Sequence, residues 1–215
     1  MTFEELSKKL AAELKKELPG FSVQSKMDPI SRKQPGEYLN ASRSPKNSAV
    51  MVLLYPNEQT SVASVILIVR SEHEKGNHSG QISFPGGGVD EKDADLSSTA
   101  LREMEEEIGV DRNSISVIGA LSPLYIPVSN YLVHPFVGIA TKRPVFKKND
   151  REVNSLLEVA IHEFLTDKNR TTSDIFLKLR NQTMQVPCFS INGKIIWGAT
   201  AMMLAEFSEV VRRIR

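Results

Sequence analysis

The first 47 residues divide into a helical pattern and an irregular one. Over residues 3–14, Phe and Leu recur every three or four positions among Glu and Lys, which predicts an amphipathic surface helix ended by Pro19 and Gly20. This charged segment lacks the apolar core of a secretion signal. Residues 26–47 contain three prolines and a glycine among mostly polar residues. They predict an irregular lead-in that is too short to be a second domain.

Two runs of β-branched and aliphatic residues follow, at residues 49–55 and 62–69. The segment 56–59 between them begins with Pro and Asn, so we expect two buried strands joined by a turn. Shorter apolar runs at 115–121 and 131–140 predict two further strands.

The C-terminal part of the chain is ambiguous in two places and clear at its end. Residues 153–161 and 175–179 fit either a strand or a helix from their periodicity. Residues 199–214 place Met, Phe, Val and Ile on a helical spacing, with arginines in the last turn, where the helix dipole favours them. Thr200 is a candidate cap for the start of this helix.

Residues 96–109 combine a strong helical signal with the densest charge in the chain. At about 100° per residue, Glu103, Glu106 and Glu107 fall within one arc of about 100°, because positions i, i+3 and i+4 share a face. Apolar side chains occupy the opposite side. Glu105 projects away from the three and is expected to be a solvated surface charge.

Three neighbouring carboxylates repel one another, at roughly a few tenths of a kcal/mol per pair. The sequence supplies only Arg102 as a nearby counter-charge. A divalent cation would remove the conflict, and oxygen ligands without Cys or His favour a hard ion, Mg²⁺ or Mn²⁺. The alternative is a solvated acidic face. The apolar side that anchors the helix and the glycine-rich segment upstream favour the metal.

That glycine-rich segment, residues 80–88, reads GQISFPGGG and predicts a strand that stops at a proline and three glycines. Consecutive glycines let the backbone approach a ligand closely. The loop could therefore present carbonyl groups to a metal or amide groups to a phosphate. Without the glutamates nearby, it would be interpreted as an ordinary tight turn.

The composition describes one soluble domain. The 215 residues are 40% hydrophobic and 25% charged, which allows a sizeable core and excludes fibres, disorder and membrane spans. With 27 basic and 26 acidic residues, there is no overall field to attract nucleic acid or an anionic membrane. The single cysteine, Cys188, excludes an internal disulfide and a cysteine-ligated zinc cluster, and it is compatible with a reducing, cytoplasmic location.

Residues 87–110 resemble the signature of the Nudix hydrolases, which runs Gly, five residues, Glu, seven residues, then Arg-Glu-apolar-x-Glu-Glu-x-Gly-apolar. The second half matches at every position from Arg102 to Val110. Counting back from Arg102, the first glutamate position holds Ala94, and the nearest carboxylate is Asp93, one residue earlier. Because that glutamate is chiefly structural in the family, the shift bears on loop geometry more than on metal binding.

A longer block upstream resembles the coenzyme A pyrophosphatase subgroup. Residues 70–71 and 78–90 match its pattern Arg-Ser-x-x-Leu-Arg-x-His-x-Gly-Gln-Val-x-Phe-Pro-Gly-Gly-x-x-Asp, except that the spacing between the two pieces is one residue longer. Lys75 stands where the second arginine is expected and keeps its charge, but not its bidentate geometry. The resemblance covers roughly residues 48–205.

The resemblance implies an α/β/α sandwich around a mixed central β-sheet. It implies a single Nudix hydrolase domain over residues 1–215, with residues 1–47 as N-terminal helix and irregular lead-in and residues 48–215 as catalytic core and C-terminal helix. The expected partner is a small nucleotide rather than nucleic acid or a membrane, and family habit suggests a homodimer.

It also implies roles for the acidic residues. Glu103 and Glu107 are the expected metal ligands, and the backbone of Gly87 is expected to join them at the metal. Glu106 is either a third ligand or the catalytic group that orients and deprotonates the attacking water. Arg102, one helical turn from Glu106, is expected to hold that carboxylate in place. Glu107 is expected to contribute to catalysis as well as to metal binding.

A catalytic base outside the helix is an alternative. Glu152 follows the polar, basic stretch 142–151, a region from which the family often recruits a base. The other interpretation of Glu152 is a surface glutamate at the start of a strand.

Coenzyme A carries a 3′-phosphate besides its diphosphate, so additional cations and polar groups are expected to bind it. The residues assigned to the substrate are Arg70, Lys75, His78, Gln81, Gly86 and Ser129. His78 could equally cap the turn before Gly80. A second basic cluster, more simply a solvated loop, comprises Lys142, Arg143, Lys147 and Lys148.

The expected reaction is Mg²⁺- or Mn²⁺-dependent hydrolysis of coenzyme A or acyl-coenzyme A to 3′,5′-ADP and (acyl-)4′-phosphopantetheine. Within the family, the alternative is a pyrophosphatase that acts on ADP-ribose or nucleoside diphosphate sugars. Outside enzymes, the alternative is a Nudix-fold sensor that binds a nucleotide without cleaving it. The presence of all three glutamates disfavours the sensor.

Overall fold

The computed structural model describes residues 1–29, 44–57, 63–71, 80–177 and 181–215. Its helices are α1 (Phe3–Glu13), α2 (Phe21–Gln24), α4 (Leu96–Ile108), α5 (Ile161–Leu165) and α6 (Gly198–Arg212), with 3₁₀ turns η1 (Ser25–Met27), η2 (Arg112–Ser114) and η3 (Asp167–Asn169). Its strands are β1 (Lys46–Pro56), β2 (Ala63–Arg70), β3 (Ile82–Ser83), β4 (Gly86–Gly88), β5 (Ser116–Ala120), β6 (Leu124–Ile126), β7 (Tyr131–Ile139), β8 (Val153–Ala160), β9 (Arg170–Leu177), β10 (Gln182–Ile191) and β11 (Lys194–Trp197).

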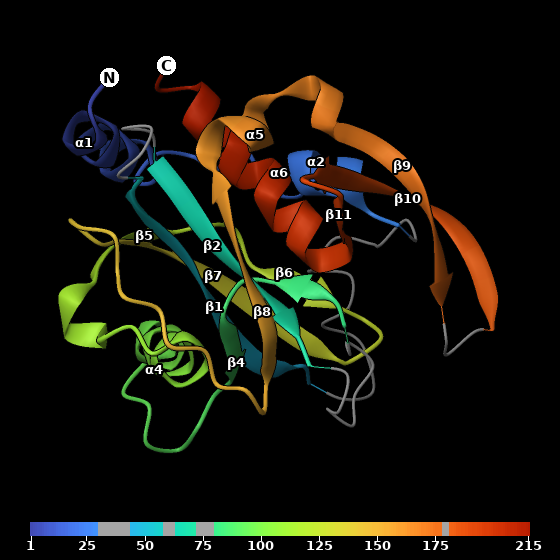
Figure 1. Ribbon diagram of the computed structural model, residues 1–215, viewed down its shortest axis with the longest axis horizontal. Coiled ribbons are helices and arrows are strands. Elements are labelled where there is room, and N and C mark those ends of the chain that lie inside the picture. The colour runs from blue at the N-terminus through green and yellow to red at the C-terminus, as the bar shows by residue number, and fades with distance from the viewer. Residues whose placement is uncertain (30–43, 58–62, 72–79, 178–180) are drawn as a thin grey trace.

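Within the described residues, eight strands form a mixed central sheet (Figure 1). Strands β3, β2, β1, β7 and β5 lie in that order, while β4, β6 and β8 pair with β1, β7 and β2 respectively. The pairing of β1 with β7 is parallel, from Lys46 opposite Tyr131 to Leu54 opposite Ile139. The remaining pairings in this sheet are antiparallel.

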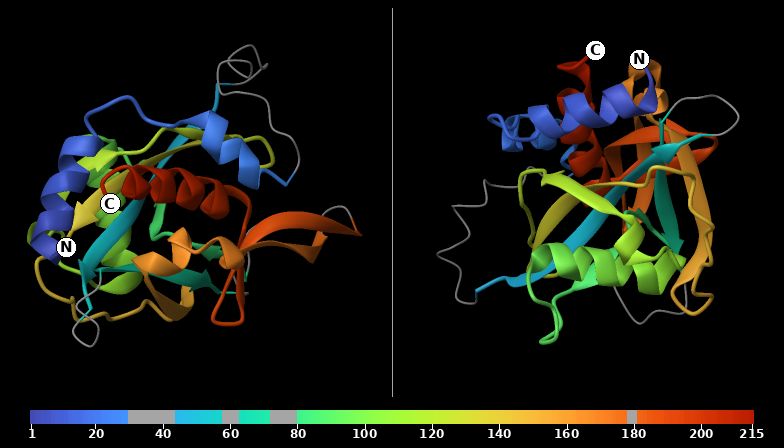
Figure 2. Two further views of the ribbon diagram at one scale, coloured as in Figure 1. Left: turned by 90° about the horizontal axis from the view of Figure 1, so that it is seen from above. Right: turned by 90° about the vertical axis from the view of Figure 1, so that its left-hand side faces the viewer.

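The central strands are apolar on both faces because each face is covered by helices. Successive strand residues alternate between faces, and β1 follows this rule: Met51, Leu53 and Tyr55 pack with the apolar side of α4. Val52 and Leu54 instead join the larger cluster that contains α6. Figure 2 shows α4 and α1 on opposite sides of the sheet. The predicted α/β/α sandwich around a mixed sheet is confirmed.

The N-terminal segment is attached to the core through a buried carboxyl group on α6. Glu206 is fully buried and accepts hydrogen bonds from the backbone of Gly20 at 3.0 Å and from the side chain of Gln24 at 2.8 Å. Ser122 donates to it through both its backbone and its hydroxyl group. Leu6 and Leu10 of α1 are also buried in the larger cluster. These contacts join the first 28 residues to the rest of the fold.

A second, three-stranded antiparallel sheet has the order β11, β10, β9. Its β9–β10 hairpin projects from the body of the molecule (Figures 1 and 2). Cys188 lies on β10 as a free, fully buried thiol. It fills space in the interior as a small apolar side chain.

The structure decides the elements that periodicity left open. Residues 153–160 and 170–177 are both strands, β8 and β9. The expected capping role of Thr200 is wrong: Trp197 is the N-cap of α6 without a side-chain bond, and the Thr200 hydroxyl donates to the carbonyl of Ile82 at 2.9 Å. The three glycines are not a loop but the short strand β4.

None of the helices in the part of the chain that the structure describes is long and apolar enough to cross a membrane.

Candidate metal and catalytic site

Helix α4 has clear sequence determinants at both ends and along one side. Asp95 caps its start by accepting a 2.8 Å hydrogen bond from the backbone of Ser98. Gly109 ends it in the left-handed conformation, φ 68°, which glycine adopts readily. Met104 and Ile108 are fully buried against the sheet. Burial of this apolar side fixes the rotation of the helix, and so the direction in which its glutamates point.

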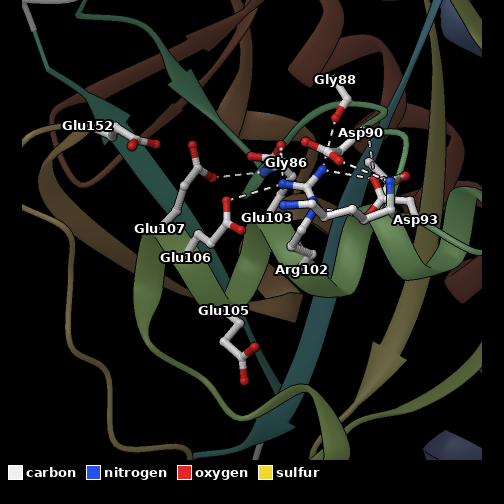
Figure 3. Close-up of polar contacts among 12 residues, drawn as sticks. Gly86, Gly88, Asp90, Asp93, Arg102, Glu103, Glu105, Glu106, Glu107 and Glu152 are labelled. Carbon is white, nitrogen blue, oxygen red and sulfur yellow. Dashed lines mark hydrogen bonds and ion pairs between the residues drawn. The ribbon is translucent and has the colours of Figure 1, made fainter.

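The four glutamates of α4 separate as their spacing predicts. Glu103, Glu106 and Glu107 project to one side, whereas Glu105 points away from them (Figure 3). The exposed fraction of the side chain is 1% for Glu107, 16% for Glu103 and 52% for Glu106, so the group runs from the interior to solvent. Glu105 points away as expected, and its partly exposed side chain pairs with Arg112 at 2.6 Å.

Strand β4 supplies the opposite wall of the site. It pairs with β1, with Gly87 opposite Ala49. The backbone amide of Gly86 donates to the Glu107 carboxylate at 2.8 Å. A Cβ atom on Gly87 would lie 2.5 Å from the Glu103 carboxylate. The absence of side chains in β4 therefore allows two of the glutamates to lie against its backbone.

Arg102 connects the helix to the loop that follows β4. Its Nε and Nη2 atoms donate to the two carboxylate oxygens of Asp93 at 2.8 and 2.9 Å. It also donates to the carbonyl of Gly88 at 3.0 Å, to Glu103 at 2.9 Å and to Glu106 at 3.1 Å. The predicted contact between Arg102 and Glu106 is present.

Asp93 explains the shifted signature. Besides its bidentate pair with Arg102, its carboxylate accepts hydrogen bonds from the backbone of Asp90 and the hydroxyl of Thr99. These donors, Arg102 first, hold the pKa of Asp93 well below its ordinary value. The loop thus places a carboxylate against Arg102 although the acid stands one residue early in the sequence.

Burial dominates the electrostatics of the deepest glutamate. It raises the pKa of Glu107 to about 8, against the charge of Arg70 and the hydrogen bond from Gly86. The negative charges of Glu103 and Glu152 raise this pKa further. The pKa of Glu103 is likewise raised, chiefly by burial, although Arg102 opposes the shift. Crowded, partly desolvated carboxylates of this kind gain most from a cation.

Glu152 lies on the same side of α4 as the three helix glutamates (Figure 3). Its charge acts on both Glu103 and Glu107. The backbone of Ser71, just after β2, donates to its carbonyl at 2.8 Å. The fold therefore brings Glu152 to the acidic site although it lies 45 residues beyond Glu107 in the sequence.

The oxygen atoms available at this site are of the kind that a hard divalent cation prefers as ligands. Glu103, Glu106 and Glu107 offer carboxylate oxygens, and the Gly87 backbone lies against one of them. As the side chains stand, no group of three His, Cys, Asp or Glu residues within the described ranges is gathered closely enough to hold a metal ion. Arginines occupy the carboxylates instead: Arg102 binds Glu103 and Glu106, and Arg70 binds Glu107 at 3.2 Å. Metal binding would require these ion pairs to rearrange.

The residues assigned to the substrate are distributed unevenly. Arg70 and Gly86 lie at the acidic site, but both contact Glu107. The carbonyl of Gln81 accepts a hydrogen bond from the backbone of Arg70. Ser129 lies in the turn between β6 and β7. Lys75 and His78 fall outside the described residues.

Two members of the second basic cluster form ion pairs with acidic residues outside the acidic site. Arg143 pairs with Glu158 at 2.6 Å, and Lys148 pairs with Asp150. These pairs agree with the interpretation of the cluster as a surface loop.

Sequence reasoning missed two contacts at this site. The ion pair between Arg70 and Glu107 joins residues 37 positions apart, and no local sequence pattern predicts it. The side chain of Asn149 donates to Glu152 at 3.2 Å. Its short spacing to Glu152 was visible in the sequence, but Asn in a polar loop carries no signal of its own.

Comparison with known proteins decides the family. Residues 45–179 match the NUDIX domain. The chain belongs to the Nudix family. It is 35% identical over 148 residues to a protein from Yersinia pestis named "Uncharacterized Nudix hydrolase NudL", which covers 69% of this chain and 72% of that protein. The protein of the same name from Yersinia pseudotuberculosis gives the same values.

A solved structure agrees at the level of the fold. The "MutT/nudix family protein from Enterococcus faecalis" aligns with a TM-score of 0.51 and 16% identity, covering 91% of this chain and 76% of that one. Membership supports a Nudix hydrolase that acts on nucleoside diphosphate derivatives, and such hydrolases generally use divalent metal ions.

Substitution of Asp93 by Asn should reduce stability in a pH-dependent way. The pKa of Asp93 is lowered in the folded state, so its contribution is present above the ordinary Asp pKa of about 4 and is lost as pH falls towards the folded value. We expect Asp93→Asn to lower the free energy of unfolding by about 2–3 kcal/mol near neutral pH. The difference from the parent should shrink on acidification below about pH 4.

Urea titrations at several pH values measure this effect. Asp90→Asn, an exposed substitution in the same loop, is the control and should change stability by less than about 0.5 kcal/mol. A difference for Asp93→Asn that stays constant down to about pH 3 would contradict the assignment.

Gly87→Ala should separate metal binding from folding. The three atoms nearest to the new Cβ all belong to the flexible end of Glu103, so the fold should be retained while that carboxylate is displaced. We expect the metal concentration for half-maximal activity to rise by on the order of tenfold. In Gly86→Ala, the Cβ would lie 2.4 Å from the backbone oxygen of Ala49, and stability should fall by about 2–3 kcal/mol instead. Thermal unfolding and metal titration of both variants test this contrast.

Proposed function

We propose that this Nudix protein hydrolyses the diphosphate of coenzyme A or acyl-coenzyme A, with Mg²⁺ or Mn²⁺, to 3′,5′-ADP and (acyl-)4′-phosphopantetheine. The observation that carries the proposal is the placement of Glu103, Glu106, Glu107 and Glu152 on one side of α4, with Glu103 and Glu107 against β4. The choice of coenzyme A within the family rests on residues 70–71 and 78–90. We propose that residues 1–215 act as one domain, that the enzyme is cytoplasmic, and that it forms a homodimer.

In this proposal, Glu103, Glu106 and Glu107 hold the divalent cation, with the Gly87 backbone beside them. When bound, the cation supplies positive charge against the diphosphate oxygens and the leaving phosphate. The composition of the chain offers no broad basic surface, so this charge matters more here than in a basic protein. Arg102 keeps Glu103 and Glu106 close to β4 through its hydrogen bonds to both.

The protein must also orient and deprotonate water. Glu152 is our choice for this base, because it lies across from the helix glutamates and belongs to a different segment. Glu106, which is half-exposed and bound to Arg102, is the alternative. A base on a separate segment leaves all three helix carboxylates available for metal binding.

Arg70 has two possible partners in the reaction. It binds Glu107 in the structure, and its guanidinium group could transfer to a substrate phosphate once a cation neutralises that carboxylate. The amide of Gly86, together with Gln81, Lys75, His78 and Ser129, completes the proposed substrate contacts. A pyrophosphatase for ADP-ribose or nucleoside diphosphate sugars is the rival within the family, and a non-catalytic sensor is the rival outside enzymes.

A substrate panel tests the proposed specificity. We expect the highest kcat/KM for coenzyme A or an acyl-coenzyme A when these are compared with ADP-ribose and nucleoside diphosphate sugars in Mg²⁺ and in Mn²⁺. Dephospho-coenzyme A is the matched control, since it differs only by the 3′-phosphate. A preference for ADP-ribose or a sugar nucleotide would overturn the coenzyme A assignment and leave the Nudix assignment intact. Tight binding without product would favour the sensor.

Glu107→Gln should lower kcat by about 100-fold or more while the protein remains folded. The amide keeps the volume of the side chain and can still accept the hydrogen bond from Gly86, but it removes the charge. Steady-state kinetics and thermal unfolding measure the two effects. The control is Glu105→Gln, on the same helix but pointing away from the site, for which we expect parental turnover. Parental turnover of Glu107→Gln would remove Glu107 from the metal site.

A further inference from the structure

We propose that Asn149 is a positioning residue that holds Glu152 towards the glutamates of α4. The proposal rests on the proposed role of Glu152 as the base. Asn149 itself is not expected to touch the substrate. Asn149 lies in the segment that connects β7 to β8, residues 140–152, which we call the β7–β8 loop.

The β7–β8 loop is attached to the end of the metal helix. The last carbonyl groups of a helix have no partner within it. Here the backbone amide of Lys147 donates to the carbonyl of Ile108 at 2.8 Å, and that of Asn149 to the carbonyl of Glu107 at 2.9 Å. The position of Asn149 is thus fixed relative to the residue whose carboxylate is the most deeply buried of the three.

A second attachment fixes the other end of the loop to the sheet. Arg143 makes two hydrogen bonds to Glu158 of β8, at 2.6 and 3.0 Å, and its guanidinium group lies 5.4 Å from the centre of the Phe146 ring. The hydroxyl of Tyr55 also donates to Glu158, at 2.9 Å. The loop that carries Glu152 is therefore held at two separate points before Glu152 is reached.

The side chain of Asn149 then sets the direction of Glu152. Its Nδ2 atom donates to the Glu152 carboxylate at 3.2 Å, and its Oδ1 atom accepts from the backbone of Arg151 at 3.1 Å. Its carbonyl accepts from the backbones of Glu152 and Val153 at 3.1 and 2.8 Å. The Oδ1 and backbone carbonyl contacts form the turn, whereas the Nδ2 donor is the part of Asn149 that contacts the carboxylate.

The charge of the donor suits this role. The negative charges of Glu103, Glu107 and Glu152 act on one another, so repulsion favours turning Glu152 away into solvent. A lysine or arginine could also hold it, but its positive charge would weaken the carboxylate as a proton acceptor. The neutral amide of Asn149 restrains the carboxylate without adding a positive charge beside the base.

The test uses two substitutions with the substrate that the panel identifies as best. Asn149→Asp keeps an oxygen for the Arg151 backbone and so the turn, but replaces the donor with a second oxygen. Asn149→Ala removes both functions without adding charge. For each, we expect kcat to fall by on the order of tenfold, with KM changed by less than about threefold. Thermal unfolding should change little.

A double-mutant cycle with Glu152→Gln distinguishes positioning from a structural effect. If Asn149 acts through Glu152, Asn149→Ala should reduce kcat by less than about twofold when Glu152 is already Gln. Asn169→Ala is the matched control: its amide also donates to a glutamate carboxylate, Glu163, at 2.7 Å. It should lower stability and leave kcat unchanged.

The outcomes separate this inference from the proposed function. Parental kcat in Glu152→Gln would overturn the role of Glu152 and, with it, that of Asn149. A large loss in Glu152→Gln together with parental kcat in both Asn149 variants would overturn the positioning role alone. Losses that multiply independently in the double variant would likewise overturn it.

Discussion

The site depends on the hydrogen bonds and ion pairs made by the guanidinium group of Arg102. In one plane of donors it binds Asp93 from the loop, the carbonyl of Gly88 from β4, and Glu103 and Glu106 from its own helix. Its side chain is only 16% exposed, so these bonds are partly shielded from water and stronger for it. Without Arg102, the polar links among the loop, the glycine strand and the helix would be reduced to bonds such as that from Gly86 to Glu107 and that from Thr99 to Asp93.

Packing of apolar side chains places the carboxylates at the site, whereas electrostatic repulsion and loss of hydration oppose that placement. Met104 and Ile108 are anchored in the core, which carries Glu107 into a nearly dry position. The fold accepts this cost because Arg70 and the Gly86 amide contact the carboxylate. The near-zero net charge of the chain therefore conceals a strong local excess of acid, which two arginines partly offset in the structure.

The sequence predicts the elements of this site better than its connections. The acidic helix and the strands 49–55 and 131–140 follow from periodicity, because a helix or a central strand repeats one local rule. The direction of Glu105 follows from the same rule, but its pairing with Arg112 does not. Local rules also fail to predict β4. Three consecutive glycines are typical of a turn, and they form a strand here because they pair with β1.

Contacts between distant segments account for the other differences. Thr200 has the chemistry of a cap, yet its hydroxyl is drawn to Ile82, 118 residues away, by the packing of α6 on β3. Asp93 stands one residue from the expected position, and the path of the loop accommodates the shift. The apposition of Glu152 to the acidic helix depends on the register of β2 with β8, which no short pattern encodes.

The attachment of the β7–β8 loop to α4 also bears on motion. Because loop amides occupy the carbonyls of Glu107 and Ile108, the final turn of the helix cannot fray without releasing the loop. Local opening of this region is thus a single cooperative event that would displace Glu107 and Glu152 together. Partial loss of one without the other is disfavoured, so the centre should exist either assembled or dispersed.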